Sequence, residues 1–253
     1  MKLSFDRAGQ GEYTFLFIHG VGTNRSFFSP EFQYFCQKAQ VLNVDLRGHG
    51  DSDKPQSGYS MEDYAEDLGW LCQQLKVKKL IIVAHSMGGN IALEFYSRHP
   101  DLVAAIALLD TNLFIPNDAL TFLSGRIEAL KNNFETALDE IIAIRCLPTD
   151  RCQKAVKEAF FATPQHVWYS SLEKMIDWDK KRAEDCVRHC QVPVLYVEGP
   201  KLVMDINRFE SNYPAKLVRG KVVGSGHFLT LEVPEQICPM IDRFLSITIK
   251  NKK

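Results

Sequence analysis

The sequence lacks the long apolar run that a membrane-spanning helix requires. None of its 253 residues belongs to a segment that approaches roughly 18 uninterrupted apolar residues. Residues 1–7 hold no apolar stretch of the length found in a signal peptide. These absences exclude a membrane span and predict a cytoplasmic protein.

Charge of one sign is also missing. The 30 Lys and Arg residues are balanced by 31 Asp and Glu residues, which leaves a formal net charge of −1 at pH 7. Proteins that bind nucleic acid or an anionic membrane concentrate Lys and Arg in runs, and this chain has no such run. We therefore expect a small-molecule partner and no nucleic acid, with the chain acting as a monomer or homodimer.

Cysteines are scattered and odd in number. Seven cysteines without regular spacing do not form a disulfide framework, so the sequence favours a reducing compartment. Cys186 and Cys190 enclose His189, but no second pair of ligands lies nearby to complete a metal site. The glycine patterns of a P-loop and of a dinucleotide site are absent too. The sequence predicts neither a metal nor an organic cofactor.

What the chain does have is an alternation of apolar strand patterns and amphipathic helix patterns. With 45% hydrophobic and 24% charged residues, it has the composition of a globular protein with a large core. The alternation predicts an α/β fold, a mostly parallel twisted sheet with helices on both faces. Strands are expected at 2–6, 13–18, 40–45, 79–84, 103–109, 193–198 and 217–223, and helices at 60–75, from residue 87 to Pro100, and at 234–247.

About eighty residues without a strand pattern separate the strands at 103–109 and 193–198. This stretch predicts a helical cap inserted between two late strands, over the edge of the sheet where open α/β sheets keep their sites. The expected division is a core of 1–110 and 191–253 and a cap of 111–190 within a single domain. Helical patterns in the cap cover 117–132, 134–146, 151–162, 165–177 and 180–190.

The segment around Ser86 is the most informative part of the chain. Residues 80–83 form a buried apolar strand pattern, and a helix pattern starts directly after the serine. A strand that turns into a helix within one residue strains the backbone and leaves room only for small neighbours at −2 and +2, here Ala84 and Gly88. The serine hydroxyl would then stand clear of the sheet at the positive end of a helix, as a nucleophile does.

Two further segments fit acyl-transfer chemistry. The strand at 13–18 leads into the run His-Gly-Val-Gly at 19–22, whose glycines would let the amide of Val21 point into a site beside the amide of Met87. Two such fixed donors stabilise a developing oxyanion. Near the C-terminus, His227 follows Gly-Ser-Gly after a strand, so its ring can reach a serine on a distant element.

Together these segments resemble the α/β-hydrolase fold superfamily, in its serine-nucleophile, esterase- and lipase-like branch, along nearly the whole chain. The resemblance implies a serine hydrolase in which Ser86 attacks an acyl carbon, His227 takes its proton, and an acid supports the histidine. It also implies that Asp45 only organises nearby loops. The matching runs, in the family's order, are His19–Gly22, Asp45–Pro55, Ala84–Gly89 and Gly224–His227.

Three acids are candidates for the last role. In this superfamily the acid commonly lies three residues after the glycine that ends the penultimate strand, and Leu202 holds that place after Gly199. Asp110 is preferred, because it ends the strand after the elbow helix, a position that some members use. Glu198 precedes Gly199, and Asp205 is expected to begin a helix, where an acid is favourable in its own right.

The aromatic cap favours an apolar or aromatic acyl group in a carboxylic ester, thioester or lactone. Two alternatives remain open. The first is a carbon–carbon hydrolase or lyase, or a cofactor-free dioxygenase, on the same fold, and Asp110 at the end of the earlier strand is compatible with the dioxygenase. A slow or non-hydrolytic ligand receptor is compatible with Leu202 at the usual acid position. Most cap aromatics are expected in its own core rather than in the pocket: Phe114, Phe122, Phe134, Phe160, Phe161, Trp168, Tyr169 and Trp178.

Overall fold

The computed structural model describes residues 1–147, 152–200, 204–215 and 217–249. Within them, seven strands form one sheet in the order β1-β3-β2-β4-β5-β6-β7. Strand β1 is antiparallel to β3, and every other neighbouring pair is parallel, which confirms the predicted mostly parallel sheet. The strands are β1 (Phe5–Ala8), β2 (Thr14–Ile18), β3 (Gln40–Val44), β4 (Leu80–His85), β5 (Val103–Leu109), β6 (Val194–Glu198) and β7 (Val218–Lys221).

The first strand begins later than the expected 2–6. The residues before it are held by a loop instead of by a neighbouring strand. The amide of Ser4 donates to Ser52 Oγ at 2.8 Å, and the amide of Lys2 donates to an Asp53 carboxylate oxygen at 2.7 Å. Side chains of the 45–53 loop thus take the hydrogen bonds that a longer strand would have used.

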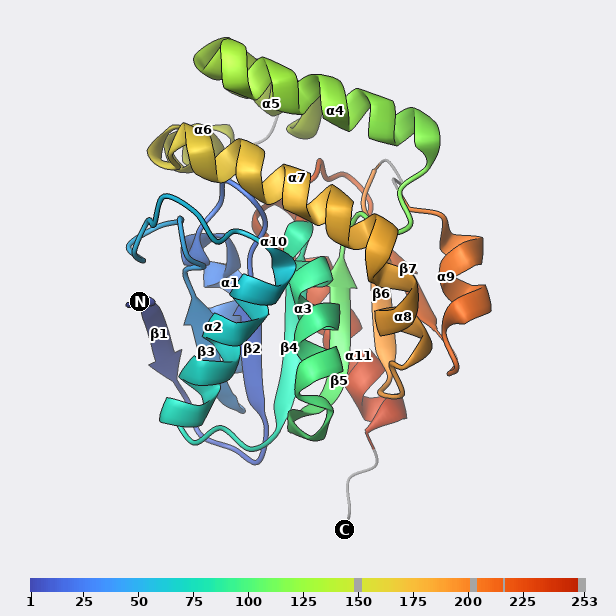
Figure 1. Cartoon of the computed structure of the whole chain (residues 1–253). Helices are drawn as coiled ribbons and strands as arrows, with labels where there is room; N and C mark the ends of the chain where they lie inside the picture. Colours follow the sequence, from blue (N-terminus) through green and yellow to red (C-terminus); the bar gives the residue numbers. More distant parts are fainter. Residues whose placement is uncertain (148–151, 201–203, 216, 250–253) are drawn as a thin grey trace.

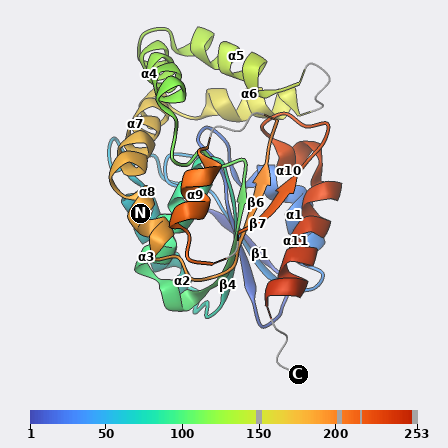
Figure 2. The ribbon, with the colours of Figure 1, turned by 90° about the vertical axis from the view of Figure 1, so that its right-hand side faces the viewer.

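Helices cover both faces of the sheet (Figure 2). On one face lie α2 (Met61–Gln74), α3 (Met87–Arg98) and α8 (Ala183–Arg188), and on the other lie α1 (Ser29–Phe35), α10 (Leu229–Glu232) and α11 (Pro234–Thr248). Along β2, Leu16 and Ile18 belong to the first core cluster, whereas Phe15 and Phe17 belong to the second. Strands that are buried on both faces are apolar throughout, as the sequence pattern indicated.

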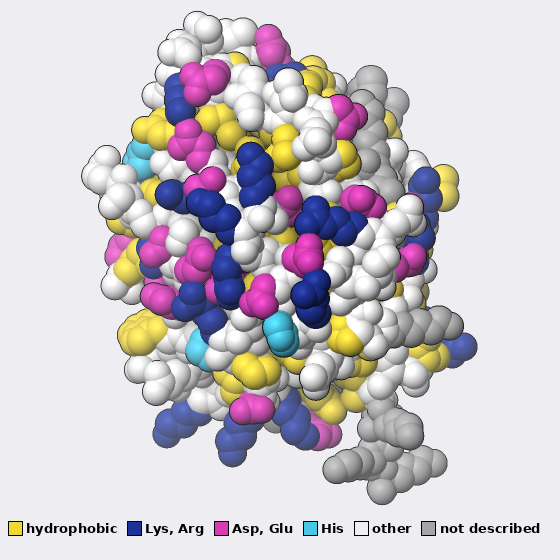
Figure 3. Space-filling model, turned by 45° about the vertical axis from the view of Figure 1, so that its right-hand side comes forward, with side chains coloured by type: hydrophobic (Ala, Val, Ile, Leu, Met, Phe, Trp, Pro, Cys, Tyr) yellow, Lys and Arg dark blue, Asp and Glu magenta, His cyan; other side chains and the backbone are white. Residues whose placement is uncertain are grey.

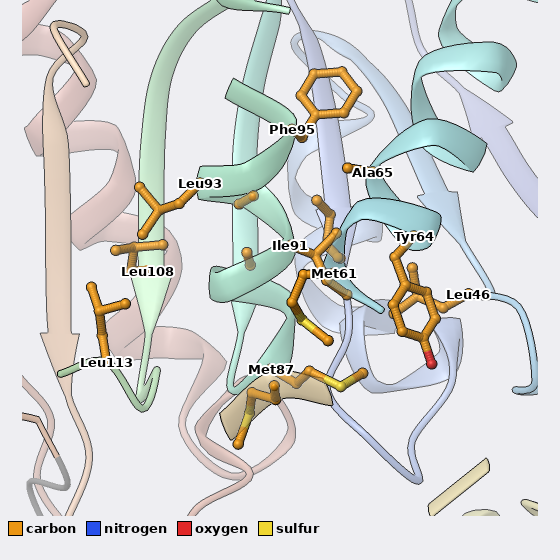
Figure 4. Packing of buried hydrophobic residues seen from close by; sticks show 14 of the residues in the cluster. Leu46, Met61, Tyr64, Ala65, Met87, Ile91, Leu93, Phe95, Leu108 and Leu113 are labelled. Carbon is orange, nitrogen blue, oxygen red and sulfur yellow. The ribbon is translucent and has the colours of Figure 1, made fainter. Parts of the chain in front are cut away.

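The first core cluster fixes the helix that follows Ser86. Figure 4 shows Met61 and Tyr64 of α2 beside Ile91 of α3, and all three side chains are fully or almost fully buried. The start of α2 is secured by the predicted cap, in which the amide of Asp63 donates to Ser60 Oγ at 3.1 Å and the amide of Ser60 donates back at 2.9 Å. Such a capping box satisfies two backbone donors of the first turn.

The expected helical insertion between two late strands is present between β5 and β6. Its helices α4 to α7 lie beyond the carboxyl ends of the strands, at the top of Figure 1. The pattern expected at 151–162 gives a helix from Gln153, and residue 151 lies outside the described part of the chain. The bounds are α4 (Asn117–Asn132), α5 (Phe134–Arg145), α6 (Gln153–Ala162) and α7 (Gln165–Lys181).

Helix α7 runs four residues past its predicted end at 177, because its last turn is tied to the core. The Trp178 indole nitrogen donates to Glu94 Oε2 at 2.8 Å. The Asp179 carboxylate accepts from the amides of Phe114 and Ile115 at 2.7 and 2.9 Å. These buried hydrogen bonds stabilise helical turns that a periodicity argument does not reveal.

The remaining elements are short. They are the 3-10 helices η1 (Arg25–Phe28) and η2 (Pro100–Leu102) and the helix α9 (Ile206–Asn212). On the face shown in Figure 3, basic and acidic side chains are interspersed. No helix in the described part of the chain is both long and apolar enough to cross a membrane.

Candidate active site

Ser86 occupies the sharp turn between β4 and α3. Its backbone has φ 54° and ψ −125°, a strained conformation for a residue with a side chain. A Cβ placed on Gly88 would lie 2.2 Å from the carbonyl oxygen of Ile18, so position +2 accepts only glycine. A Cβ placed on Gly20 would lie 2.9 Å from the Cβ of Ser86. The glycine loop after β2 therefore passes directly beside the serine.

His227 connects Ser86 to Asp110. Its Nε2 lies 3.1 Å from Ser86 Oγ, and its Nδ1 lies 2.6 Å from Asp110 Oδ2. The backbone of the histidine is held as well, since its amide donates to the carbonyl of Arg145 at 2.8 Å. Its carbonyl accepts from Nε2 of His85 at 2.8 Å. The structure thus brings together three residues that are 24 and 117 positions apart along the chain.

Asp110 follows β5 directly and has a positive φ of 45°. Its carboxylate lies over Gly199, where an added Cβ would come within 2.3 Å of Asp110 Cγ. The glycine that marks the end of the penultimate strand therefore leaves space for an acid that comes from the neighbouring strand. The amide of Asp110 donates to the carbonyl of Val197 at 2.9 Å, which holds the two strand ends in register.

The two other candidate acids have different partners. Glu198 accepts from Nε of Arg219 at 3.2 Å. Asp205 caps α9, where its side chain accepts from the amide of Arg208 at 3.0 Å. Leu202, at the family's usual acid position, lies outside the described residues. Of the three candidates, the structure places Asp110 against His227.

The electrostatics of this group favour a neutral imidazole beside an ionised acid. Burial alone raises the pKa of the Asp110 carboxyl, but the hydrogen bond and charge of His227 outweigh it, so the pKa lies below its usual range. Burial and the nearby Arg145 guanidinium lower the pKa of His227, and Asp110 opposes them. With Nδ1–H donated to the carboxylate, Nε2 is free to accept the Ser86 proton.

The expected oxyanion donors lie next to Ser86. Val21 and Gly20 line the same pocket as Ser86. Met87 is the first residue of α3, so its amide is one of the first-turn donors that have no acceptor within the helix. The glycine loop after β2 and the first residue of α3 thus lie on either side of the serine. The oxyanion role of Val21 and Met87 stays a prediction.

Two buried histidines, His19 and His85, support this arrangement. Nε2 of His19 accepts from the amide of Leu46 at 3.0 Å, and its Nδ1 donates to the carbonyl of Gly20 at 2.8 Å. Burial lowers the pKa of His19 to about 4, and that of His85 to about 3. Both rings are therefore neutral and hold backbone, His19 at the glycine loop and His85 at His227.

The pocket above Ser86 is roofed by α4 to α7. Three of the eight cap aromatics line it, namely Phe122, Phe160 and Trp168. Trp168 packs so closely on the loop that a Cβ on Gly22 would lie 1.9 Å from its ring. The other five aromatics do not line this pocket, and they do not all form a core of the cap, since Phe161 is 37% exposed and Trp178 donates to Glu94 of α3. Apolar residues that also line the pocket are Leu123, Ile141, Ile144, Leu172, Met175 and Phe228.

The same pocket contains two arginines that the sequence did not indicate. Arg126 of α4 and Arg145 of α5 both line it. They lie 19 residues apart on different helices, so no local pattern connects them, and only the packing of the helices brings them to Ser86.

Asp45 has the structural role expected of it. Its carboxylate accepts from the amide of Arg25 at 2.7 Å and from the amide of Asp51 at 2.9 Å, and it pairs with the Arg25 guanidinium. It thus fixes the 45–53 loop. Within residues 1–147, 152–200, 204–215 and 217–249, no group of three or more His, Cys, Asp or Glu side chains is arranged to hold a metal ion.

Several known proteins with similar sequence or structure are named as hydrolases. Over 120 residues the chain is 36% identical to 2-(acetamidomethylene)succinate hydrolase from Mesorhizobium japonicum, an alignment that spans 47% of this chain and less than half, 43%, of that protein. An esterase structure from Exiguobacterium antarcticum matches with a TM-score of 0.86 at 21% identity, over 96% of this chain and 95% of that one. An enol-lactonase structure from Burkholderia xenovorans matches with a TM-score of 0.84 at 20% identity, over 96% of each chain.

The family assignment rests on most of the chain. The sequence model of the alpha/beta hydrolase fold matches residues 13–229, a range that includes Ser86, Asp110 and His227. The mostly parallel sheet and the turn at Ser86 are those expected from the resemblance. The chain belongs to the alpha/beta hydrolase fold family.

Proposed function

We propose that the protein is a serine hydrolase that cleaves a carboxylic ester, thioester or lactone through an acyl-enzyme at Ser86. The observation that carries this proposal is the continuous chain of short contacts from Ser86 Oγ through His227 to Asp110, at the base of a largely apolar pocket. A serine, a neutral base that accepts its proton and an acid that orients the base are the parts that acyl transfer requires.

The reaction begins with proton transfer from Ser86 Oγ to Nε2 of His227 as Oγ bonds to the acyl carbon. Asp110 holds Nδ1–H at 2.6 Å and stabilises the imidazolium that forms. The imidazolium then returns the proton to the departing alcohol or thiol as the carbon–oxygen or carbon–sulfur bond breaks. A water molecule, deprotonated by the same nitrogen, attacks the acyl-enzyme and releases the acid.

The amides of Val21 and Met87 are the proposed donors to the oxyanion. Gly20 passes beside Ser86 because it has no side chain, and the hydrogen bonds of His19 hold the loop in this place. Removing one such donor costs roughly 10²- to 10³-fold in rate in comparable sites. The positive end of α3 adds to the same field.

Residues 111–190 form the proposed cap, and residues 1–110 and 191–253 the proposed core. The apolar lining of the pocket supports an acyl group that is mainly apolar. The hydrolase, esterase and enol-lactonase names of similar proteins support ester or lactone chemistry at the same place in the fold.

One alternative keeps the same residues. A carbon–carbon hydrolase or lyase would also use a histidine supported by an acid, and a cofactor-free dioxygenase is compatible with an acid at the end of β5, where Asp110 lies. Oxygen consumption that accompanies turnover would favour the dioxygenase. Hydrolysis of simple esters under anaerobic conditions would favour the esterase.

A panel of p-nitrophenyl esters with acyl chains of two to twelve carbons tests the proposal. The wild-type enzyme is expected to turn over at least part of the panel, whereas Ser86→Ala and His227→Ala should each lose roughly a millionfold in kcat. The double variant should lose little more than either single variant, because the members of such a group act together. Near-normal turnover by Ser86→Ala would contradict the proposal.

A further inference from the structure

The two arginines are unusual because the other pocket-lining side chains of α4 to α7 are apolar. The Arg126 side chain is 15% exposed, and Arg145 is partly buried. Their neighbours in the pocket include Leu123, Ile141 and Phe160. Cationic side chains are rarely buried among apolar ones unless a partner neutralises them. We therefore expect Arg126 and Arg145 to bind an anionic partner.

Arg126 has a partner at the surface. Its Nη1 lies 2.9 Å from Glu140 Oε2, and the Glu140 side chain is 58% exposed. An ion pair with an exposed partner orients the guanidinium but contributes little to the free energy of unfolding. The remaining N–H donors of Arg126 are available to the pocket, since a guanidinium has five.

Arg145 has no carboxylate within ion-pair distance among the residues that the structure describes. Its Nη1 lies 3.4 Å from Nδ1 of His227, a nitrogen that already donates to Asp110. Both groups are therefore donors, and the contact does not satisfy the arginine. The charge of Asp110 attracts Arg145, but that carboxylate is engaged by His227 and is needed to support the imidazolium.

The two cations also repel each other. Burial lowers the pKa of Arg145, and the charge of Arg126 lowers it further. A pocket that keeps two like charges together in a weakly polar surrounding is stabilised when an anion enters it. The guanidinium fork matches a carboxylate in shape and can bind it through two hydrogen bonds.

We propose that the substrate carries a carboxylate in addition to the scissile ester, and that Arg126 and Arg145 bind it. This inference rests on the proposed function of Ser86 and refines the expectation of an apolar acyl group. Ser86 lies at Nε2 of the His227 ring and Arg145 lies at Nδ1, so several bonds must separate the ester from the carboxylate. The apolar lining accommodates the chain between them.

The arrangement also makes the base responsive to the substrate. The groups that face His227 are Asp110 from β5, the neutral ring of His85 from β4, and Arg145 from α5. Arg145 lowers the pKa of His227. A carboxylate on Arg145 cancels part of that effect, so His227 becomes a stronger base when the charged substrate is bound. A neutral ester leaves the effect of Arg145 on the pKa of His227 unchanged.

Binding is tested first with Ser86→Ala, which cannot turn the ligand over. Monomethyl suberate and dimethyl suberate have the same chain, but only the monoester has a carboxylate. We expect calorimetry to give a dissociation constant about ten- to a hundredfold lower for the monoester, the range for one or two hydrogen bonds to a charged group. Adding Arg145→Gln or Arg126→Gln should remove most of this difference. Arg188→Gln, which breaks an exposed pair with Glu184, is the matched control and should leave the difference intact.

Turnover gives a second readout. With the otherwise wild-type protein, kcat/KM should be higher for the monoester by a similar factor, and Arg145→Gln should remove most of this preference through KM. The acidic limb of the pH profile with the dimethyl ester should move to higher pH in Arg145→Gln, because a cation that lowers the pKa of His227 is gone.

The results separate the two proposals. Tight binding of the monoester by Ser86→Ala without turnover by the wild type would support the anion site and overturn hydrolysis. Equal binding and equal turnover of the monoester and the diester, unchanged by Arg145→Gln, would overturn the anion site while hydrolysis stands.

Discussion

The floor of the pocket and its roof are built in different ways. The floor consists of strand ends, where Ser86 follows β4 and Asp110 follows β5, and the two strands pair directly in register. The roof consists of helices α4 to α7, which contact the floor through side chains, such as Trp168 on Gly22, and through a backbone hydrogen bond from the amide of His227 to the carbonyl of Arg145. Backbone pairing fixes positions more tightly than isolated side-chain contacts do. We therefore expect changes in the floor to alter rate and changes in the roof to alter substrate choice.

Apart from changes at Ser86 and His227, we expect the largest loss of kcat among changes in the floor and the roof from a change at Asp110. Asp110→Asn keeps the size of the side chain but removes the charge that stabilises the His227 imidazolium. The value of kcat should fall about 10⁴-fold, the scale seen when the acid of such a group is neutralised. Ester hydrolysis at saturating substrate measures the change.

Glu198→Gln is the matched control, because Glu198 ends the neighbouring strand and pairs with Arg219 instead of His227. We expect a change of a few-fold at most. A large loss for Glu198→Gln together with a small loss for Asp110→Asn would move the acid to β6 and contradict the assignment.

A smaller effect is expected from the residue that leaves space for the acid. In Gly199→Ala, the new methyl group would overlap the Asp110 carboxylate, whose atoms lie 2.3–2.5 Å from the added Cβ. The carboxylate must move, and a displacement of about 1 Å in a catalytic group costs up to about 10²-fold in rate. Both kcat and thermal stability should fall.

Gly125→Ala serves as the control for this change. Gly125 lies on α4 with no atom within 4 Å of an added Cβ. Removing a helical glycine should stabilise the protein by about 0.5–1 kcal/mol and leave kcat unchanged. Unaltered activity in Gly199→Ala would show that the acid does not depend on this space.

The smallest effects on catalytic rate should come from changes in the roof. Phe122 is 52% exposed and lines the pocket, so Phe122→Ala should cost little stability but shift the chain-length preference of the ester panel a few-fold. Trp168 is buried against Phe160 and the glycine loop, so Trp168→Ala should cost about 3–5 kcal/mol of unfolding free energy. Denaturant unfolding and the ester panel together distinguish the two. A lowered kcat without a change of preference in Phe122→Ala would erase the contrast between roof and floor.

The sequence predicted the floor well because its signals are local. A strand followed at once by Ser86 and a helix, with Gly88 at +2, left few alternatives, and the structure shows the close contacts that make glycine necessary there. The helices of the insertion were also foreseen with bounds that differ by a few residues. Their apolar periodicity is a local property too.

The roof's chemistry could not be foreseen, because it depends on tertiary packing. Arg126 and Arg145 have no motif, and they line the same pocket as Ser86 only because α4 and α5 pack over the carboxyl ends of the strands. The sequence could not decide among Asp110, Glu198 and Asp205 for the same reason. Each of the three acids lies at the end of a strand or at the start of a helix, and only tertiary packing places one of them, Asp110, against His227. The oxyanion role of Val21 and Met87 remains a prediction.

We have proposed that Ser86 is a nucleophile and that His227 activates it. Labelling with a fluorophosphonate, followed by peptide mass spectrometry, tests it most directly, since this reagent bonds to an activated serine with loss of fluoride. We expect a stoichiometric adduct on the peptide that contains Ser86, and its loss in His227→Ala. An adduct on another serine, or equal labelling of Ser86 when His227 is absent, would contradict it.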